Sequence, residues 1–428
     1  MLPEGWVRKP LSACAKFVSG GTPSKGNDAY WGGEFPWITA KDMKTLWLKK
    51  AGLGLTDQGR SAATIVPSGS ILTLTRGMTL LKDFPVCLAG RELAFNQDIK
   101  ALLPHGDVDS TFLAYQLIAN KQNVLNLVDT AGHGTGRLDT ELLKGLLIDL
   151  PPLPEQRQIA AGLATWDKAI AIAERLLVNS RQQKLSLLSK TLCIPAAVSE
   201  VSDRDRSGSL PPSVRAGIPK LPRTPAGWER VHLGKYLREV NRPVMLEPER
   251  EYTLVTVKRS RGGVHRREVL HGGEVKTRTQ FIVKTGDFLI SKRQIVHGAC
   301  GIVPSELDGA VVSNEYAVMN ADDGIDLDFL RHLSESIYFQ QTCFHSSIGV
   351  HVEKMIFKTE RWLAWPFNIP PLHEQRRIVE VLDAATAEVT AIERQLGALK
   401  LEKHALMQQL LTGKRRVHLL EPAEAAGP

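Results

Sequence analysis

Two long stretches of the chain carry apolar residues at alternating spacings of four and three positions. This heptad pattern continues for more than four repeats in each stretch and is typical of a coiled coil. We therefore predict long helices over residues 151–195 and 370–413 that pair with each other; the alternative is that each is only a core helix of its own domain. A lysine, Lys184 or Lys403, interrupts each apolar series at the same place. The positions expected to form the contact seam are Ile159, Leu163, Trp166, Ile170 and Leu177 in the first helix and Ile378, Leu382, Val389, Ile392 and Leu396 in the second.

The two stretches also open on the same motif. Pro-Pro-Leu-Pro-Glu-Gln-Arg at residues 151–157 returns as Pro-Pro-Leu-His-Glu-Gln-Arg at residues 370–376. Proline cannot continue as helix interior, so these residues mark the point where an extended segment ends and a helix begins. Glu155 and Glu374 then fall in the first helical turn, where the helix dipole stabilises a negative charge.

The chain before each helix repeats as well, which indicates a duplicated domain-plus-helix unit with a pseudo-two-fold axis. Pro3–Trp6 returns as Pro225–Trp228, at an offset of 222 residues. The other landmarks share an offset of 217 residues: Trp37–Lys41 with Leu254–Lys258, Gly69–Arg76 with Gly286–Arg293, Phe95–Asp98 with Val312–Glu315, and Phe112–Leu113 with Phe329–Leu330.

These landmarks predict the order of the parts. We expect a globular domain over 1–150, the central long helix over 151–195, an exposed Pro-rich linker over 196–223, a second globular domain over 224–369, the distal long helix over 370–413, and a basic and then flexible tail over 414–428.

Each globular half is predicted to consist mostly of strands followed by a helix. Runs of β-forming residues bounded by Gly and Pro predict strands near residues 35–40, 70–75, 252–257 and 287–291. Helices are expected over 110–119 and 327–339. Together these elements favour an α+β fold with two β-rich globular domains and two long helices.

Charge changes this picture because the net charge of +8 is not spread evenly. Residues 258–293 contain ten Lys or Arg against three Asp or Glu, a net of +7, whereas residues 1–150 contain sixteen against fourteen, a net of +2. A cluster of positive charge on one domain is typical of a surface that binds a polyanion. The alternative is an ordinary solvated surface.

Cysteine usage and hydropathy indicate the compartment. The five cysteines are scattered and form no Cys-x-x-Cys pair, which favours a reducing environment over a disulfide framework or a zinc ribbon. No run of 18 apolar residues exists, and the first residues lack the charged and apolar regions of a signal peptide. We expect a cytoplasmic protein without a membrane span.

Motifs for catalysis are missing or broken. The chain has no Gly-x-x-x-x-Gly-Lys-[Ser/Thr] phosphate loop, and the Gly-rich run at 132–136 follows a helix-like segment, so we interpret it as a loop. Asn-Ile-Pro-Pro at 368–371 departs in spacing from the motif of amino-methyltransferases, and Glu-Val-Lys at 274–276 lacks the Pro-Asp of a nuclease motif. We predict no catalytic residue, no metal site and no cofactor in this chain. The alternative is a solitary DNA methyltransferase or nuclease with a degenerate active site.

Basic and amide side chains remain as candidates for recognition of double-stranded DNA. Lys and Arg bind phosphates, Arg is the usual bidentate reader of guanine, and Gln and Asn read adenine. The pairs related by the repeat, Lys41 with Lys258, Arg76 with Arg293 and Gln97 with Asn314, are preferred, although such positions could instead mark a shared scaffold. The full set of DNA-binding candidates is Lys25, Lys41, Arg76, Gln97, Lys258, Arg259, Arg261, His265, Arg266, Arg267, Lys292, Arg293, Gln294 and Asn314.

The duplicated Pro-Pro-Leu-x-Glu-Gln-Arg helix, with Ser-Gly-Gly-Thr-Pro-Ser at 19–24 and Tyr-Trp-Gly-Gly at 30–33, resembles the DNA specificity (S) subunit of Type I restriction–modification systems. The resemblance covers the chain except the linker and the extreme tail. It implies that each globular domain is a target-recognition domain for one half of an asymmetric bipartite DNA site. It also implies that the two helices pair antiparallel and set the gap between the half-sites.

The same resemblance implies partners. A subunit of this family has no catalytic activity and binds two methyltransferase subunits, which carry S-adenosylmethionine and methylate adenine. Two ATP-dependent restriction and translocation subunits, which use ATP and Mg, then join. A third interpretation is an interaction scaffold that has lost DNA binding.

Overall fold

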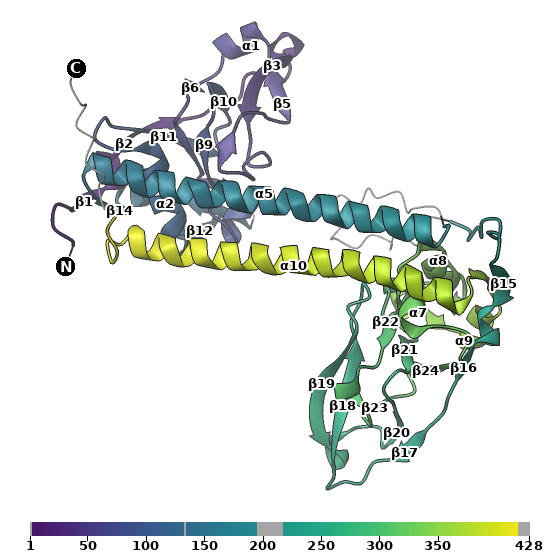
Figure 1. Ribbon diagram of the computed structural model, residues 1–428. Coiled ribbons are helices and arrows are strands. Elements are labelled where there is room, and N and C mark those ends of the chain that lie inside the picture. The colour runs from purple at the N-terminus through teal and green to yellow at the C-terminus, as the bar shows by residue number, and fades with distance from the viewer. Residues whose placement is uncertain (1, 132–133, 195–216, 418–428) are drawn as a thin grey trace, which may run out of the picture. The chain divides into compact units, whose positions relative to one another are not determined.

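The computed structural model describes residues 2–131, 134–194 and 217–417 (Figure 1). The chain divides into unit 1, made of Met1–Glu174 and Arg394–Pro428, and unit 2, made of Arg175–Glu393. This division falls inside both long helices, so each unit contains half of each helix. Residues 196–216 of the predicted linker and 418–428 of the predicted tail lie outside the described residues.

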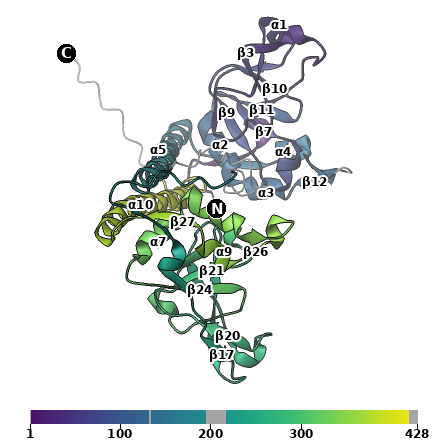
Figure 2. The same ribbon diagram turned by 90° about the vertical axis from the view of Figure 1, so that its right-hand side faces the viewer.

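Unit 1 is rich in short strands. Its sheets are β1 (Val7–Pro10) with β14 (Leu147–Leu150); β5 (Leu53–Leu55), β3 (Trp31–Ile38), β10 (Leu93–Phe95) and β6 (Ile65–Val66); β2 (Ala15–Ser19), β11 (Ile99–Pro104), β7 (Ile71–Leu74), β9 (Val86–Ala89) and β4 (Trp47–Leu48); and β12 (Val128–Ala131), β13 (Thr135–Leu138) and β8 (Arg76–Gly77). Its shorter helices are α1 (Asp57–Ser61), α2 (Ser110–Ala119), α3 (Lys121–Leu125) and α4 (Thr140–Lys144). Helix α2 packs against β9 and β11 (Figure 2).

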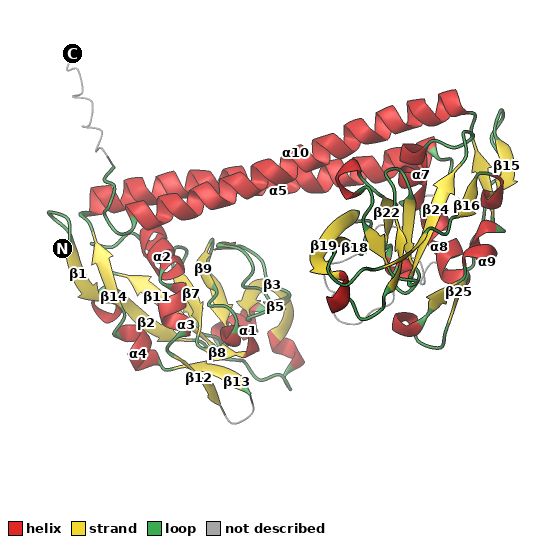
Figure 3. Cartoon of the chain, turned by 90° about the horizontal axis from the view of Figure 1, so that it is seen from below, coloured by secondary structure: helices red, strands yellow, loops and turns green. Residues whose placement is uncertain are grey.

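Unit 2 has a closely similar set of elements (Figure 3). Its sheets are β15 (Glu229–His232) with β27 (Pro366–Ile369); β16 (Leu237–Glu239), β24 (Tyr316–Ala321), β21 (Phe288–Ser291) and β22 (Cys300–Ile302); β17 (Pro243–Met245), β20 (Thr279–Ile282), β23 (Val311–Val312), β18 (Glu251–Val257) and β19 (Val264–His271); and β25 (Ser347–Ile348) with β26 (Ile356–Phe357). Its shorter helices are α7 (Leu327–Ser334), α8 (Ile337–His345) and α9 (Thr359–Leu363).

The two units share the order and register of several paired strands. Trp37 pairs with Ala94 across the parallel strands β3 and β10, and Leu254 pairs with Val311 across β18 and β23. Both residues of the second pair lie 217 positions after those of the first. The antiparallel pairs β7–β11 and β21–β24 match at the same offset. The predicted internal repeat and the α+β class are therefore confirmed.

One predicted helix is wrong in its extent. The sequence predicted a single helix over 327–339, whereas the chain breaks between α7 and α8. Ser336 causes the break, because its Oγ accepts a hydrogen bond from Phe339 N at 3.2 Å and so caps a new helix.

The long helices are α5 (Leu153–Thr191) and α10 (Leu372–Leu410), and within each unit their segments lie side by side (Figure 1). In unit 1 the contacts pair rising numbers in α5 with falling numbers in α10, so the two helix segments run antiparallel there. In unit 1 these contacts are Asp167 Oδ1 to Lys403 Nζ at 2.5 Å and Glu174 Oε1 to Lys400 Nζ at 2.7 Å. In unit 2, Ser180 Oγ donates to Glu388 Oε1 at 3.0 Å and Arg181 Nη2 donates to Glu393 Oε1 at 2.6 Å, so the two helices are also in contact there.

The predicted seam positions lie on the buried side of these helices. Leu163 and Leu382 are fully buried, and each belongs to the apolar core of its own unit. Ile159, Leu177, Ile378, Ile392 and Leu396 are also buried, whereas Trp166, Ile170 and Val389 are half-buried. The ends of α5 and α10 therefore pack against each other and also against the core of the unit in which they lie.

The seam lysines are held by carboxylates. The carboxylate of Asp167 accepts from Lys403 and, at 2.6 Å, from the Tyr115 hydroxyl. The Lys403 ammonium also lies 5.1 Å from the centroid of the Tyr115 ring. In unit 2, Lys184 Nζ lies 2.9 Å from Glu335 Oε2. An ammonium without a partner in a buried helix seam is costly, so each lysine is stabilised by its carboxylate. The Asp167–Lys403 bond joins α5 to α10 in unit 1, and the Lys184–Glu335 bond joins α5 to the residue after α7 in unit 2.

A glutamine explains why the opening motif recurs. In both units its side-chain amide joins the start of the long helix to the turn before α2 or α7. Gln156 donates to Asp107 O at 3.1 Å and Pro151 O at 2.8 Å, and accepts from Asp109 N at 2.9 Å. Gln375 donates to Gly324 O at 3.1 Å and Pro370 O at 2.9 Å, and accepts from Asp326 N at 2.8 Å. The motif thus serves the framework of each unit.

The acidic residue of the motif behaves differently in the two units. Glu155 is buried, and its carboxylate accepts two bonds from Arg416, both at 2.8 Å. Arg416 belongs to the segment predicted as a basic tail, and it is tied to the first turn of α5. Glu374 is half-buried.

Candidate nucleic-acid interface

The Ser-Gly-Gly-Thr-Pro-Ser segment of unit 1 lies against the end of β10. Gly21 N donates to the last carbonyl of β10 at 2.9 Å, and Thr22 Oγ1 donates to Gln97 Oε1 at 2.5 Å. A Cβ on Gly20 would come within 2.2 Å of the Asn96 carbonyl oxygen, so only glycine allows this close approach. The segment therefore positions Gln97, a predicted base reader, in the exposed turn between β10 and β11.

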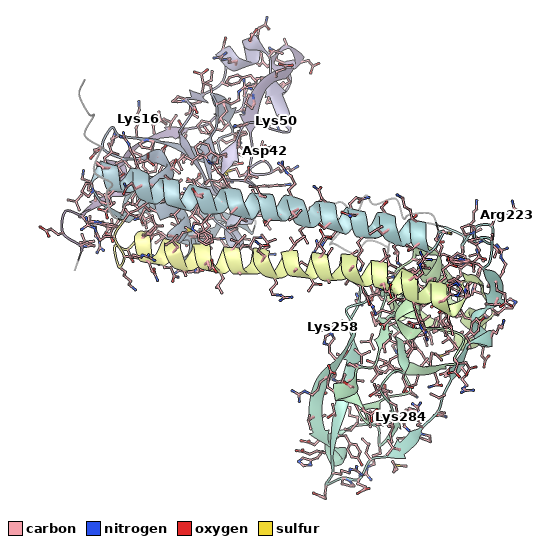
Figure 4. The ribbon with its side chains drawn as sticks, in the orientation of Figure 1. Lys16, Asp42, Lys50, Arg223, Lys258 and Lys284 are labelled. Carbon is pink, nitrogen blue, oxygen red and sulfur yellow. The ribbon has the colours of Figure 1, made fainter. Side chains whose placement is uncertain are left out.

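Two predicted lysines of unit 1 are open to solvent. Lys25 and Lys41 are exposed, and neither forms an ion pair with another described residue. Lys41 follows β3 in a turn closed by Asp42, which Figure 4 labels. The Asp42 carboxylate accepts from Thr39 N and Thr39 Oγ1, both at 2.8 Å, so its charge is used within the turn.

Arg76 of unit 1 lies directly opposite another arginine. In the β8–β13 pair, Arg76 lies opposite Arg137. On the other side of β13, Arg137 lies opposite Asp129 of β12. All three side chains are exposed, and no ion pair joins them within the described residues. Like charges directly opposite each other are destabilising, so this site favours an anion. Sequence reasoning missed Arg137, because its neighbour is visible only once the strands pair.

The basic turn of unit 2 joins β18 to β19, and its backbone is anchored. Ser260 N donates to His297 O at 2.7 Å and Arg261 N to Gly298 O at 2.9 Å. Ser260 and Arg261 have φ of 55° and 57°, a conformation uncommon for residues with a side chain. Arg261 Nε donates to Ser334 O at 2.8 Å, and its guanidinium covers Gly298. Arg261 is half-buried and supports the turn from inside.

Arg259, in the same turn, is held from two sides. Its Nε donates to Gln294 Oε1 at 2.8 Å and its Nη2 to Glu353 Oε2 at 3.0 Å. The other oxygen of Glu353 lies 3.1 Å from His297 Nε2. Burial lowers the pKa of His297, and the positive charge of Arg259 lowers it further, against the opposing effect of Glu353. Lys258, labelled in Figure 4, is exposed at the start of this turn.

Lys292 and Arg293 follow β21 and also lie against carboxylates. Lys292 Nζ is 3.0 Å from Glu239 Oε1, and Arg293 Nε donates to Glu315 Oε1 at 2.6 Å. Asn314, beside Glu315, is exposed. Two of the predicted DNA contacts, Arg293 and Asn314, therefore lie on two adjoining loops of unit 2.

The outer strand β19 carries the remaining candidates. His265, Arg266 and Arg267 are exposed. His265 Nε2 lies 2.6 Å from Gly262 O, and Arg267 pairs with Glu268. These side chains extend the positive surface of unit 2 along the strand.

Metal binding and thiol reactivity can be examined among the described residues. Among the described residues, no group of three or more His, Cys, Asp or Glu side chains is placed to hold a metal ion. Burial raises the pKa of the Cys14 thiol to about 11 and that of Cys87 to about 12, so both are inert thiols. None of the helices in the described ranges is long and apolar enough to cross a membrane.

The Gly-rich run needs one correction. It was interpreted as a loop after a helix-like segment, but the segment before it is strand β12 and Thr135 and Gly136 belong to β13. Residues 132 and 133 lie outside the described residues.

The comparisons with known proteins first define a class. Residues 3–179 match the family described as Type I restriction modification DNA specificity domain. These residues include the recognition candidates of unit 1 and the first 27 residues of α5.

Individual relatives carry the same description. The chain is 29% identical over 168 residues to the Type I restriction enzyme EcoR124I/EcoR124II specificity subunit of Escherichia coli, covering 38% of this chain and 42% of the relative. It is 30% identical over 175 residues to the MjaIX specificity subunit of Methanocaldococcus jannaschii, covering 40% and 39%. The chain thus spans about two fifths of these two curated relatives. With the MjaVIII specificity subunit of the same organism, identity is 22% over 97% of this chain and 94% of the relative.

Solved structures extend the similarity to both units. The S subunit of a Type-I restriction-modification system from M. genitalium matches with a TM-score of 0.56 at 13% identity, over 95% of this chain and 96% of that one. A chain from a study of complex assembly and conformational transition of the type I R-M system matches with a TM-score of 0.52 at 18% identity, over 97% and 100%. At these identities the likeness establishes the fold. The resemblance predicted from the sequence motifs is confirmed.

Proposed function

We propose that this chain is the DNA specificity subunit of a Type I restriction–modification system. The observation that carries the proposal is the duplication: strand register and the glutamine bonds recur in both units, whereas the charged surfaces differ. Two copies of one framework with different surfaces suit an asymmetric site in which each unit reads one half. The family match over residues 3–179 and the specificity-subunit relatives support this assignment.

The paired helices suggest how the two half-sites are kept at a fixed spacing. Each helix contributes to the core of both units, because Leu163 of α5 and Met407 of α10 lie in the core of unit 1, whereas Leu188 of α5 and Leu382 of α10 lie in that of unit 2. A helix anchored at both ends resists sliding. The helix pair would therefore set the gap between the two recognised half-sites.

In this role the chain is not an enzyme. Two methyltransferase subunits would bind S-adenosylmethionine and methylate adenine, and two ATP-dependent restriction subunits would use ATP and Mg. These partners place the protein in the prokaryotic cytoplasm, where the DNA is.

The experiment that tests the proposal is genome-wide mapping of adenine methylation in cells that express this chain with the methyltransferase subunit of its own system. A motif of two short blocks around a fixed unspecified gap is expected. A soluble complex that produces no such motif would overturn the proposal in favour of a scaffold without DNA recognition. Binding of S-adenosylmethionine by the isolated chain would instead favour a solitary methyltransferase.

A further inference from the structure

Arg293 and Glu315 lie on two loops whose backbones are bonded to each other. Lys292 N donates to the Glu315 carbonyl at 2.8 Å, and Lys292 O accepts from Phe357 N at 2.8 Å. The loop of Glu315 is closed by Tyr316 N, which donates to a carbonyl within the same turn at 3.2 Å. The distance between the two side chains is therefore set by the framework of unit 2.

The ion pair between Arg293 and Glu315 uses only Nε of the arginine. Arg293 Nε donates to Glu315 Oε1 at 2.6 Å, and 51% of the arginine side chain and 50% of the glutamate side chain are exposed. An ion pair this exposed contributes little to stability. A guanidinium has five N–H donors in a fixed plane, and four of them, on Nη1 and Nη2, have no partner among the described residues. One N–H of Nη1 and one N–H of Nη2 lie side by side at the free end of the guanidinium, and this pair of donors matches O6 and N7 of guanine.

Neighbouring cations do not have this arrangement. Arg259 uses both Nε and Nη2 within the protein, and Lys292 is bound to Glu239. In unit 1 the counterpart of Arg293 is Arg76, and the counterpart of Glu315 is Asp98. The Asp98 carboxylate accepts from Asn96 Nδ2 at 3.1 Å, and among the described residues no ion pair joins it to Arg76.

The geometry points to Glu315 as a positioning residue that holds Arg293 by its Nε and directs the Nη edge to a guanine in the half-site of unit 2. This inference rests on the proposed function and deepens it. A guanidinium fixed in its plane loses less freedom on binding a base and tolerates fewer wrong bases than a mobile one. Glu315 thereby determines specificity without touching the DNA.

The test compares Glu315→Gln, Arg293→Ala and the double variant, each as the full chain in complex with its methyltransferase subunit. The probe is a pool of double-stranded DNA with the half-sites randomised, and the readout is base preference at each position. Glu315→Gln is expected to reduce the preference for guanine roughly 3- to 10-fold at the one position that Arg293→Ala also relaxes. In the Arg293→Ala background, Glu315→Gln should cause no further change at that position. Glu315→Asp, which keeps the charge, should restore part of the preference.

Asp98→Asn is the matched control, because it removes the corresponding charge in unit 1 without an arginine to release. It should leave every preference unchanged. Unchanged preferences in Glu315→Gln would overturn the inference. A uniform gain in affinity for all sequences would also overturn it, because Glu315 would then only compete with phosphates for Arg293. Absence of any preference in the unsubstituted complex would overturn the proposed function itself.

Discussion

In unit 2, Arg259, Lys292 and Arg293 each lie against a glutamate, whereas in unit 1 Lys25, Lys41 and Arg76 have no carboxylate partner within the described residues. The larger positive charge of unit 2 is therefore partly neutralised and oriented, while the few cations of unit 1 are open. Open cations suit phosphates, and oriented arginines suit base edges. We propose that the two units, which share a framework, contact DNA by different means.

The largest effect is expected from a charge in the shared helix seam. Leu382→Lys places an ammonium at a fully buried position of unit 2, at a cost of about 3–5 kcal/mol in the free energy of unfolding. Leu396→Lys does the same in unit 1. Urea denaturation measures both, with Leu401→Lys as the control, because Leu401 is 71% exposed on the same helix. If Leu382→Lys were no worse than Leu401→Lys, the seam would be assigned incorrectly.

The second prediction tests whether the framework is equivalent in both units. Gln156→Leu and Gln375→Leu each leave three backbone groups without their partner, which costs about 2–4 kcal/mol. Equal losses of unfolding free energy are expected from the two variants. Gln122→Leu, which removes one exposed bond, is the control and should cost about 0.5 kcal/mol or less. A loss of unfolding free energy in only one of these two variants would contradict equivalent roles for the two glutamines.

Acid should destabilise unit 2 through Glu335. Burial raises the pKa of Glu335, but the hydrogen bond from His332 and the charge of Lys184 outweigh it and lower the pKa from 4.5 to about 2. Folding therefore favours the charged form, and this contribution is complete above pH 5 or so and is lost as the pH falls toward 2. It amounts to about 3 kcal/mol at most. Glu335→Gln should flatten the dependence of unfolding free energy on pH over this range. Glu393→Gln, which removes an exposed ion pair, should follow the unsubstituted chain.

The smallest effects are expected from Arg293→Ala and Arg76→Ala, which should change DNA affinity in different ways. Arg293→Ala should cost about 1–3 kcal/mol at one base pair and relax that position alone. Arg76→Ala should weaken binding uniformly across sequences and reduce the slope of log affinity against log salt by about one, as expected for a phosphate contact. Binding titrations against a site series and a salt series measure both. The same signature for both variants would remove the proposed difference between the units.

Much of the framework could be predicted from the sequence, because it depends on periodicity and repetition. The 4-3 spacing located the buried positions of both helices, and the constant offset located strands that pair in the same register. The roles of Arg137, Arg261 and Glu315 could not be predicted. Each depends on which side chain lies across a strand or loop, and neither spacing nor composition specifies that neighbour. The break at Ser336 was missed because a cap and a helix interior share the same apolar pattern there.

The division of the chain also determines the order in which its parts can be completed during translation. Unit 2 is one continuous segment, whereas unit 1 needs α10 beyond Arg394 and the Arg416 bond to Glu155. The core of unit 1 includes Met407 and Leu410 of α10, whereas unit 2 needs no residue beyond Glu393. The core of unit 1 can therefore be completed only after the whole of unit 2 has been synthesised.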